Sequence, residues 1–215
     1  MSNYWWVTRP KRKLNSVPEV LSTFAEMSLN QQWAGQKTSQ LSLEEALEKS
    51  GLKRQGERRD QGAGGARTYK AWLVSLGLIF TQESTKQIKL TLAGEAIING
   101  DNPVDILKNQ VLKYQFPSAF SIGKNVEVSS RFKIHPFVFL LKLLMDNRIQ
   151  YLNANEIADI VIVEAENESD SCYEYIVKRI IEYRSFGQQI LSEDFCEKYG
   201  VKSGSTNLND VANTM

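Results

Sequence analysis

The chain lacks most of the residues that mark secreted, membrane-bound or metal-binding proteins. Its 215 residues include only two cysteines, Cys172 and Cys196, and one histidine, His135. The cysteines have no CxxC spacing, so the sequence predicts neither a disulfide framework nor a zinc site. No run approaches the roughly 18 apolar residues that a membrane span needs, and no apolar core follows the basic N-terminus as in a signal peptide. We therefore expect a cytoplasmic protein without a membrane segment.

Short catalytic and nucleotide-binding motifs are missing as well. The patterns GxSxG, GxxxxGK[ST] and GxGxxG do not occur, and the glycines within Gly62–Gly65 follow no apolar strand. His135 precedes Pro136 at an expected helix start, which favours packing or capping over general-base work. The alternating acids Glu164, Glu166, Glu168 and Asp170 lack the turn glycine of a calcium loop, so we interpret them as a solvated loop. The sequence thus predicts no catalytic, cofactor-binding or metal-binding residue.

Charge is nearly balanced overall, but it is unevenly distributed. The net charge is +1, yet residues 1–13 contain four bases and no acid, and residues 53–70 contain six bases and two acids. Residues 149–177 show the opposite, with seven acids and no Lys or Arg. The first half therefore indicates a polyanionic partner, and part of the second half indicates solvent or a basic partner.

The segment Gly65–Gly100 carries the most informative pattern of secondary structure. It predicts a helix over 66–76 that stops at Gly77, followed by two short strands over 78–80 and 88–90 with a polar tip between them. Thr91 then begins a helix that runs through Ile98. Helix, two-stranded wing and helix follow one another in winged helix-turn-helix proteins, which points to DNA.

Side chains suited to DNA phosphates and base edges lie on and around the helix that precedes this wing. Arg67 stands at its N-terminal end, where a recognition helix meets base edges, and Tyr69 is predicted on its polar side next to Lys70. We expect Trp33 and Trp72 to lie in the core. The residues predicted to bind DNA are Arg9, Lys11, Arg12, Lys13, Arg54, Arg58, Arg59, Arg67, Tyr69 and Lys70.

Helix start signals divide the rest of the chain. Ser16 before Pro18 predicts a first helix, and Ser42 with Glu45 predicts a capping box that opens the second. Asn102 before Pro103 predicts another helix, from residue 104 to about 114. The apolar face of the first helix is expected to comprise Val17, Val20, Leu21 and Phe24.

The second half shows further helical patterns. Pro136 begins a strongly apolar helix over 137–145, Asn153 caps a helix that contains Glu156, and a longer helix runs over 173–184. A short helix is expected over 192–199. The inward face of the apolar helix is predicted to comprise Phe137, Leu140, Leu141 and Leu144.

These patterns together predict a mainly α fold with small β wings (α+β) and tandem winged helix-turn-helix-like subdomains. Residues 1–118 form an N-terminal arm and the first subdomain in this interpretation, residues 119–202 form the second, and residues 203–215 form a linker and the start of a truncated helix. Because natural domains rarely stop two turns into an amphipathic helix, we expect that the chain is a fragment.

Four blocks of sequence give a specific family resemblance: Trp5–Leu21, Thr91–Gly100, Pro103–Ser118 and Ile134–Leu144. In this order and spacing, the chain resembles the N-terminal recognition region of Type IIS restriction endonucleases and nicking endonucleases of the AlwI kind. The resemblance implies recognition of double-stranded DNA by a monomer through winged-helix subdomains. It also implies a separate C-terminal nuclease domain or subunit that uses Mg²⁺.

The nuclease motif itself is missing from this sequence. Metal-dependent cleavage of this type needs an acid two residues before a lysine, and no lysine of the chain has one. The nearest pattern, Asp146-Asn147-Arg148, is interpreted as a helix C-cap. We therefore expect a Type II site-specific endodeoxyribonuclease as the parent protein and a non-catalytic chain here. The alternative is a free-standing winged-helix transcription regulator or a protein-interaction scaffold.

Overall fold

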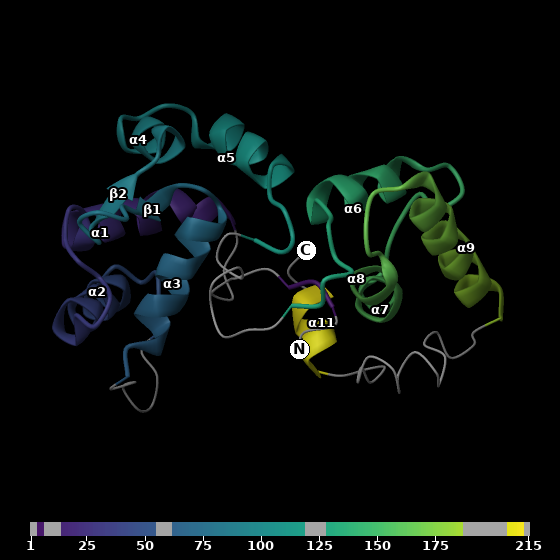
Figure 1. Ribbon diagram of the computed structural model, residues 1–215, viewed down its shortest axis with the longest axis horizontal. Helices are drawn as coiled ribbons and strands as arrows, with labels where there is room; N and C mark the ends of the chain where they lie inside the picture. The colour runs from purple at the N-terminus through teal and green to yellow at the C-terminus, as the bar shows by residue number, and fades with distance from the viewer. Residues whose placement is uncertain (1–3, 7–13, 55–61, 119–127, 187–205, 213–215) are drawn as a thin grey trace. The chain divides into compact units, whose positions relative to one another are not determined.

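Two compact units make up the computed structural model, which describes residues 4–6, 14–54, 62–118, 128–186 and 206–212. The unit that we call the hairpin unit comprises Thr8–Val111. The unit that we call the long-helix unit comprises Met1–Val7 and Leu112–Met215. The described residues are mainly helical and contain one small antiparallel sheet, which confirms the α+β expectation at that level (Figure 1). None of the described helices is long and apolar enough to cross a membrane.

The hairpin unit consists of helices around a two-stranded sheet. Its elements are α1 (Val17–Ser28), preceded by a 3₁₀ turn (Leu14–Ser16), α2 (Lys37–Lys49), α3 (Gly64–Ser75), β1 (Ile79–Thr81), β2 (Ile88–Leu90), α4 (Leu92–Ile98) and α5 (Pro103–Leu112), whose last residue belongs to the other unit. The predicted inner face of α1 is confirmed, because Val17, Val20, Leu21 and Phe24 are all buried. Trp33 and Trp72 are buried as expected and belong to the same core.

The start of α2 was predicted wrongly. The helix begins at Lys37, so Ser42 lies inside it and caps nothing. The buried Gln40 explains the earlier start, because its Nε2 donates to the carbonyl oxygen of Trp33 at 2.8 Å and fixes the first turn against the preceding loop. The hydrogen bond from Gln40 to the preceding loop therefore decides where the helix begins, and the capping pattern at Ser42 does not. The predicted end of the helix is confirmed, with Gly51 at φ +73° just beyond it.

The sheet matches the predicted hairpin to within one residue. β1 pairs antiparallel with β2, and Ile79 faces Leu90. The segment before α2 joins the far edge of β2, where Asn30 N donates to Ile88 O at 2.9 Å and Ile88 N donates to Gln31 O at 3.0 Å. The turn between α1 and α2 is therefore bonded to the edge of the sheet, a contact that the sequence pattern did not reveal.

The turn from β2 into α4 depends on a close approach of two backbone segments. Thr91 caps α4 as predicted, because its Oγ1 accepts a hydrogen bond from Gly94 N at 3.1 Å. The same hydroxyl donates to Gly77 O at 2.6 Å. A Cβ on Gly94 would lie 2.1 Å from the carbonyl oxygen of Leu78, so glycine is required at this position.

The long-helix unit is built around a 17-residue helix. Its elements are α6 (Pro136–Met145), α7 (Ala154–Glu156), a π-helical segment η2 (Ile157–Val161), α8 (Ile162–Glu164), α9 (Asp170–Phe186) and α11 (Thr206–Ala212). Asn153 forms the predicted cap with Glu156 as a complete capping box. The short helix expected over 192–199 lies outside the described residues.

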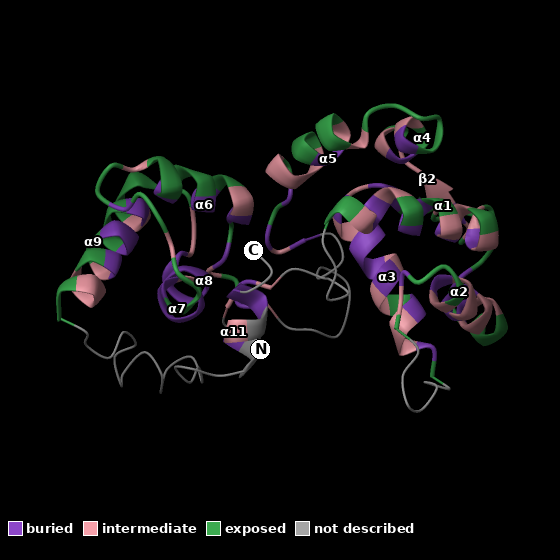
Figure 2. Ribbon diagram, turned by 180° about the vertical axis from the view of Figure 1, so that it is seen from behind, coloured by how far each residue is buried: buried purple, intermediate pink, exposed green. Residues whose placement is uncertain are grey.

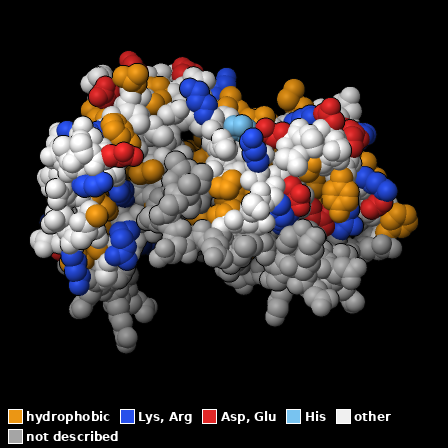
Figure 3. All heavy atoms as spheres, viewed as in Figure 1, with side chains coloured by type: hydrophobic (Ala, Val, Ile, Leu, Met, Phe, Trp, Pro, Cys, Tyr) orange, Lys and Arg blue, Asp and Glu red, His pale blue; other side chains and the backbone are white. Residues whose placement is uncertain are grey.

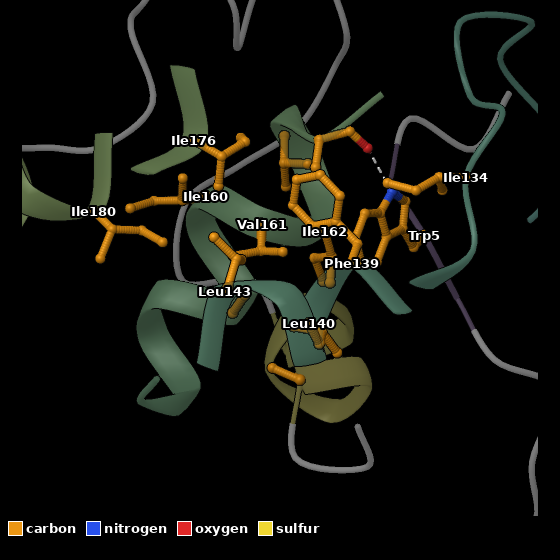
Figure 4. Packing of buried hydrophobic residues seen from close by; sticks show 14 of the residues in the cluster. Trp5, Ile134, Phe139, Leu140, Leu143, Ile160, Val161, Ile162, Ile176 and Ile180 are labelled. Carbon is orange, nitrogen blue, oxygen red and sulfur yellow. Dashed lines mark hydrogen bonds between the residues drawn. The ribbon is translucent and has the colours of Figure 1, made fainter. Parts of the chain in front are cut away.

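Trp5 anchors the N-terminal segment in the core of this unit (Figure 4). Its indole Nε1 donates to Ala165 O at 2.8 Å, its backbone N donates to Ile162 O at 2.8 Å, and its ring packs edge-on against Phe139. The sequence interpretation had assigned the whole N-terminal arm to the first subdomain. The packing of Trp5 instead places this part of the arm with the second half of the chain.

The inner face of α6 differs from the predicted one. Phe139, Leu140 and Leu143 are buried, whereas Leu141 and Leu144 are 47% and 43% exposed. Figure 2 shows that α6 has both buried and exposed parts. Every position from Phe137 to Met145 except Lys142 is apolar, so periodicity alone does not identify which side faces the core. The tertiary contacts with η2 and α9 decide it.

Candidate nucleic-acid interface

The solvent side of α3 carries two cations in a row along the helix. Arg67 is exposed, and Lys70 stands three residues later, so both lie on the same side of the helix. Arg67 Nη1 donates to Gly62 O, which connects its guanidinium with the loop before the helix. Lys70 Nζ donates to Thr81 Oγ1 at 3.3 Å. This second contact joins the polar side of α3 to the end of strand β1.

Tyr69 does not belong to this surface, and its predicted position on the polar side of the helix is wrong. The residue is 3% exposed, and its hydroxyl donates to Leu52 O at 2.7 Å. Its ring packs edge-on against Trp72 within the core. Helix α3 turns two adjacent sides toward the core, so Tyr69 is buried together with Trp72. The carbonyl oxygen of Leu52 accepts the hydrogen bond that the buried Tyr69 hydroxyl needs. Tyr69 therefore holds α3 in place and offers no surface for DNA.

The junction between α2 and α3 contains a buried carboxylate that sequence reasoning missed. Glu44 of α2 is 2% exposed, and its Oε2 accepts a hydrogen bond from Ala66 N, in the first turn of α3, at 3.2 Å. Its Oε1 lies 2.8 Å from Lys53 Nζ, and the same amine contacts Glu48 Oε1 at 2.6 Å. Burial acts to lower the pKa of Lys53, but the hydrogen bonds to the two glutamates outweigh it and leave this pKa raised. Lys53 is therefore a structural cation.

The hairpin adds a cation of its own. Lys89 on β2 pairs across the sheet with Phe80, and its Nζ donates to Asn30 Oδ1 at 2.7 Å. The strict alternation Ile88-Lys89-Leu90 is the signal that places Lys89 on the outer side of the hairpin. Lys86 stands in the polar tip with a φ of +59°.

The remaining predicted DNA contacts are only partly described. Arg54 is exposed beyond the end of α2. Arg9, Lys11, Arg12, Lys13, Arg58 and Arg59 lie outside the described residues. In the hairpin unit, Figure 3 shows Lys and Arg side chains mainly over the α2 and α3 side and Asp and Glu side chains mainly around α4. The structure thus brings Arg67 and Lys70 together on one surface.

The interpretation of the alternating acids as a solvated loop is correct only in part, because Glu168 and Asp170 are exposed whereas Glu164 is buried. Most carboxylates of the acidic segment 156–174 pair with basic side chains from other parts of the unit, and Glu156 and Asp159 are buried as well. The pairs are Glu156 with Arg184, Glu164 with Arg179, Glu166 with Arg131, Glu168 with His135, and Glu174 with Arg148. The charge of this segment is therefore neutralised mainly within the fold.

A polar network closes the end of α6. Arg148 contacts Asp146 at 2.7 Å and Glu174 at 2.8 Å, and the Tyr173 hydroxyl donates to Asp146 Oδ2 at 2.9 Å. Hydrogen bonds from Arg148 hold the pKa of Asp146 well below its usual range. Burial raises the pKa of Tyr173 to about 12, and the bond to Asp146 acts in the same direction. The Asp-Asn-Arg pattern therefore stabilises the end of a helix.

These carboxylates do not fit a Mg²⁺ site. Within the described residues, no group of three or more His, Cys, Asp or Glu side chains is placed to hold a metal ion. Glu164 and Glu166 form ion pairs with arginines, and a metal would have to displace those partners.

A comparison with protein families identifies the chain. The family described as AlwI restriction endonuclease has a sequence model that matches residues 74–212. Because this match spans more than half of the chain, the protein belongs to the AlwI restriction endonuclease family. The match begins at the end of α3, so Arg67 lies just outside it, as does the block Trp5–Leu21. No curated protein matches the chain.

Proposed function

We propose that the hairpin unit is a winged-helix module that reads a short sequence in double-stranded DNA for a restriction endonuclease of this family. The observation that carries the proposal is the polar surface formed by Arg67, Lys70 and Thr81, where a helix and a hairpin meet. Family membership adds support, because restriction endonucleases act on DNA.

The order of elements supports the winged-helix assignment. α1 is followed by a turn at Asn30–Gln32 that is hydrogen-bonded to β2, then by α2, α3 and the β1–β2 hairpin. Winged helix-turn-helix proteins use the same order, with the helix before the hairpin entering the major groove. In this unit that helix is α3, whose apolar side contributes Ala66, Trp72 and Leu73 to the core.

The two cations of this surface suit different groups of DNA. The planar guanidinium of Arg67 matches the two acceptors of a guanine edge, and Lys70 supplies a point charge for phosphate. Arg67 exchanges its hydrogen bond to Gly62 O for these acceptors when DNA is bound. Lys86 and Lys89 on the hairpin would contact the neighbouring phosphates of the DNA backbone.

The chain acts as the recognition part of a Type IIS or nicking enzyme, binds as a monomer, and works with a nuclease domain or subunit that carries the Mg²⁺ chemistry. The long-helix unit is a second winged-helix-like subdomain in the same interpretation. The family match favours this reading over a free-standing regulator.

Selection from a random duplex pool followed by binding measurements tests the proposal. The full chain should enrich one short asymmetric sequence. Its affinity for that duplex should fall with salt, with a logarithmic slope of about 0.9 per phosphate contacted. A pool that shows no enrichment, or an affinity that does not change between low and physiological salt, would contradict it.

Arg67 and a matched control separate base reading from phosphate contact. Arg67→Ala should weaken binding to the selected duplex by about 1 to 3 kcal/mol and binding to a scrambled duplex much less. Lys13→Ala on the N-terminal arm should weaken both about equally, and Lys108→Ala, exposed on α5, should weaken neither. Equal losses on both duplexes for Arg67→Ala would make Arg67 a phosphate clamp and disprove α3 as the reading helix.

A further inference from the structure

We infer that Glu44 is a positioning residue for DNA recognition: it fixes the first turn of α3, and thereby the placement of Arg67, without contacting DNA. The inference rests on the proposed function. Glu44 belongs to α2, yet its Oε2 accepts a hydrogen bond from the backbone N of Ala66, one residue before Arg67. No sequence pattern indicates this role, because Glu44 is one of several polar residues in the sequence of α2.

The surroundings of Glu44 make this contact rigid. The side chain is 2% exposed, and Lys53 holds the second carboxylate oxygen at 2.8 Å. Lys53 is itself fixed by Glu48 at 2.6 Å. Because a buried charge is costly to leave unpaired, the carboxylate has one strongly preferred arrangement. The first turn of α3 is thereby tied to α2 through a charged, directional contact rather than through apolar packing alone.

Gly65 shows how closely the two helices approach. A Cβ at this position would lie 2.7 Å from Lys53 Cε and 2.8 Å from Glu44 Oε1. The backbone conformation there is ordinary for any residue, so a larger residue at this position would displace the side chains of the ion pair without straining the backbone. Ala63 just before the helix is fully buried with a φ of +54°. Ala63, Gly65 and Ala66 together hold the start of α3 in one place.

The contact between Glu44 and the first turn of α3 affects specific DNA binding more than non-specific DNA binding. Base edges are read only when the guanidinium of Arg67 arrives in a fixed geometry, whereas phosphate contacts tolerate displacement. Loosening the first turn of α3 should therefore reduce the ratio of affinities for the selected and scrambled duplexes. A purely structural role would lower the folded fraction and reduce both apparent affinities by the same factor, which leaves the ratio unchanged.

The test compares Glu44 with its neighbour Glu48. Both acids pair with Lys53, and Glu44 in addition accepts a hydrogen bond from Ala66 N of α3. We expect Glu44→Ala to lower the affinity ratio about tenfold or more, and Glu48→Ala to change it less than about twofold. Glu44→Gln keeps an acceptor for Ala66 N and should restore most of the ratio. Equal effects of Glu44→Ala and Glu48→Ala, or an unchanged ratio in Glu44→Ala, overturn the inference.

A second variant covers the case in which Glu44→Ala does not fold. Gly65→Ala keeps every charge but pushes Lys53 and Glu44 away from the helix start, and it should also lower the ratio about tenfold. A folded Gly65→Ala protein with the wild-type ratio overturns the inference. Failure of the wild-type chain to prefer any duplex refutes the proposed function instead, so the two failures are distinguishable.

Discussion

The ion pair between Glu156 and Arg184 gives a quantitative test of how the long-helix unit is held together. The Glu156 side chain is 0% exposed and accepts hydrogen bonds from Arg184 Nε at 2.6 Å and from Arg184 Nη2 at 3.0 Å. Arg184→Met preserves much of the apolar stem but removes both donors. Removing one partner of a buried pair costs about 3 to 5 kcal/mol, because the other charge is left buried without compensation.

Three further contacts of Arg184 bring the expected loss of stability toward the upper part of this range. Arg184 also donates to the carbonyl oxygens of Ile149 and Tyr151, and its guanidinium lies 4.1 Å from the centre of the Tyr151 ring. The capping bond from Asn153 N to Glu156 Oε2, at 2.9 Å, remains in the variant. We therefore expect the free energy of unfolding to fall by about 4 kcal/mol, a large share of the 5 to 15 kcal/mol typical of a domain.

A control on the same helix is available. Lys178 lies 3.6 Å from Glu182, with side chains 74% and 42% exposed, so Lys178→Met should cost less than about 1 kcal/mol. Urea unfolding followed by circular dichroism measures both variants. Combining Arg184→Met with Glu156→Gln should recover part of the loss, because the buried charge is removed. Similar small losses for Arg184→Met and Lys178→Met would refute the reasoning.

Three further outcomes are expected. Gly94→Ala should destabilise the hairpin unit by an amount at or above the upper end of about 1 to 3 kcal/mol, because its Cβ would meet the Leu78 carbonyl oxygen; an unchanged urea midpoint would contradict this. The folded-state pKa of Tyr173 is raised to about 12, so the neutral phenol contributes stability that is fully present below about pH 10 and is lost as the pH rises toward 12. Tyr173→Phe should weaken this alkaline loss in urea titrations at pH 9 and 11.5, and an identical pH dependence would speak against it. The chain alone should not nick or linearise supercoiled plasmid with Mg²⁺, and cleavage that persists through purification and disappears in a carboxylate variant would prove the prediction wrong.

Local signals in the sequence were sufficient to predict several elements of the fold. The hairpin, the Thr91 cap of α4 and the Asn153 capping box of α7 each depend on residues within a few positions of one another. The hydrophobic period of α1 identified its buried side because polar residues separate the apolar ones. Short-range hydrogen bonding and a clear alternation of polarity fix these features before any distant part of the chain is placed.

Long-range contacts decided the candidate site and the charge balance. Tyr69 is buried because the Leu52 carbonyl accepts its hydroxyl, and Glu44 is tied to α3 by Ala66, 22 residues away in the sequence. The buried acids Glu156 and Glu164 pair with arginines that lie outside the acidic segment in the sequence. Sequence by itself determined the order of the elements and the basic character of α3. Only the tertiary structure decided which side chains remain for a partner, because burial and pairing depend on residues that meet only after folding.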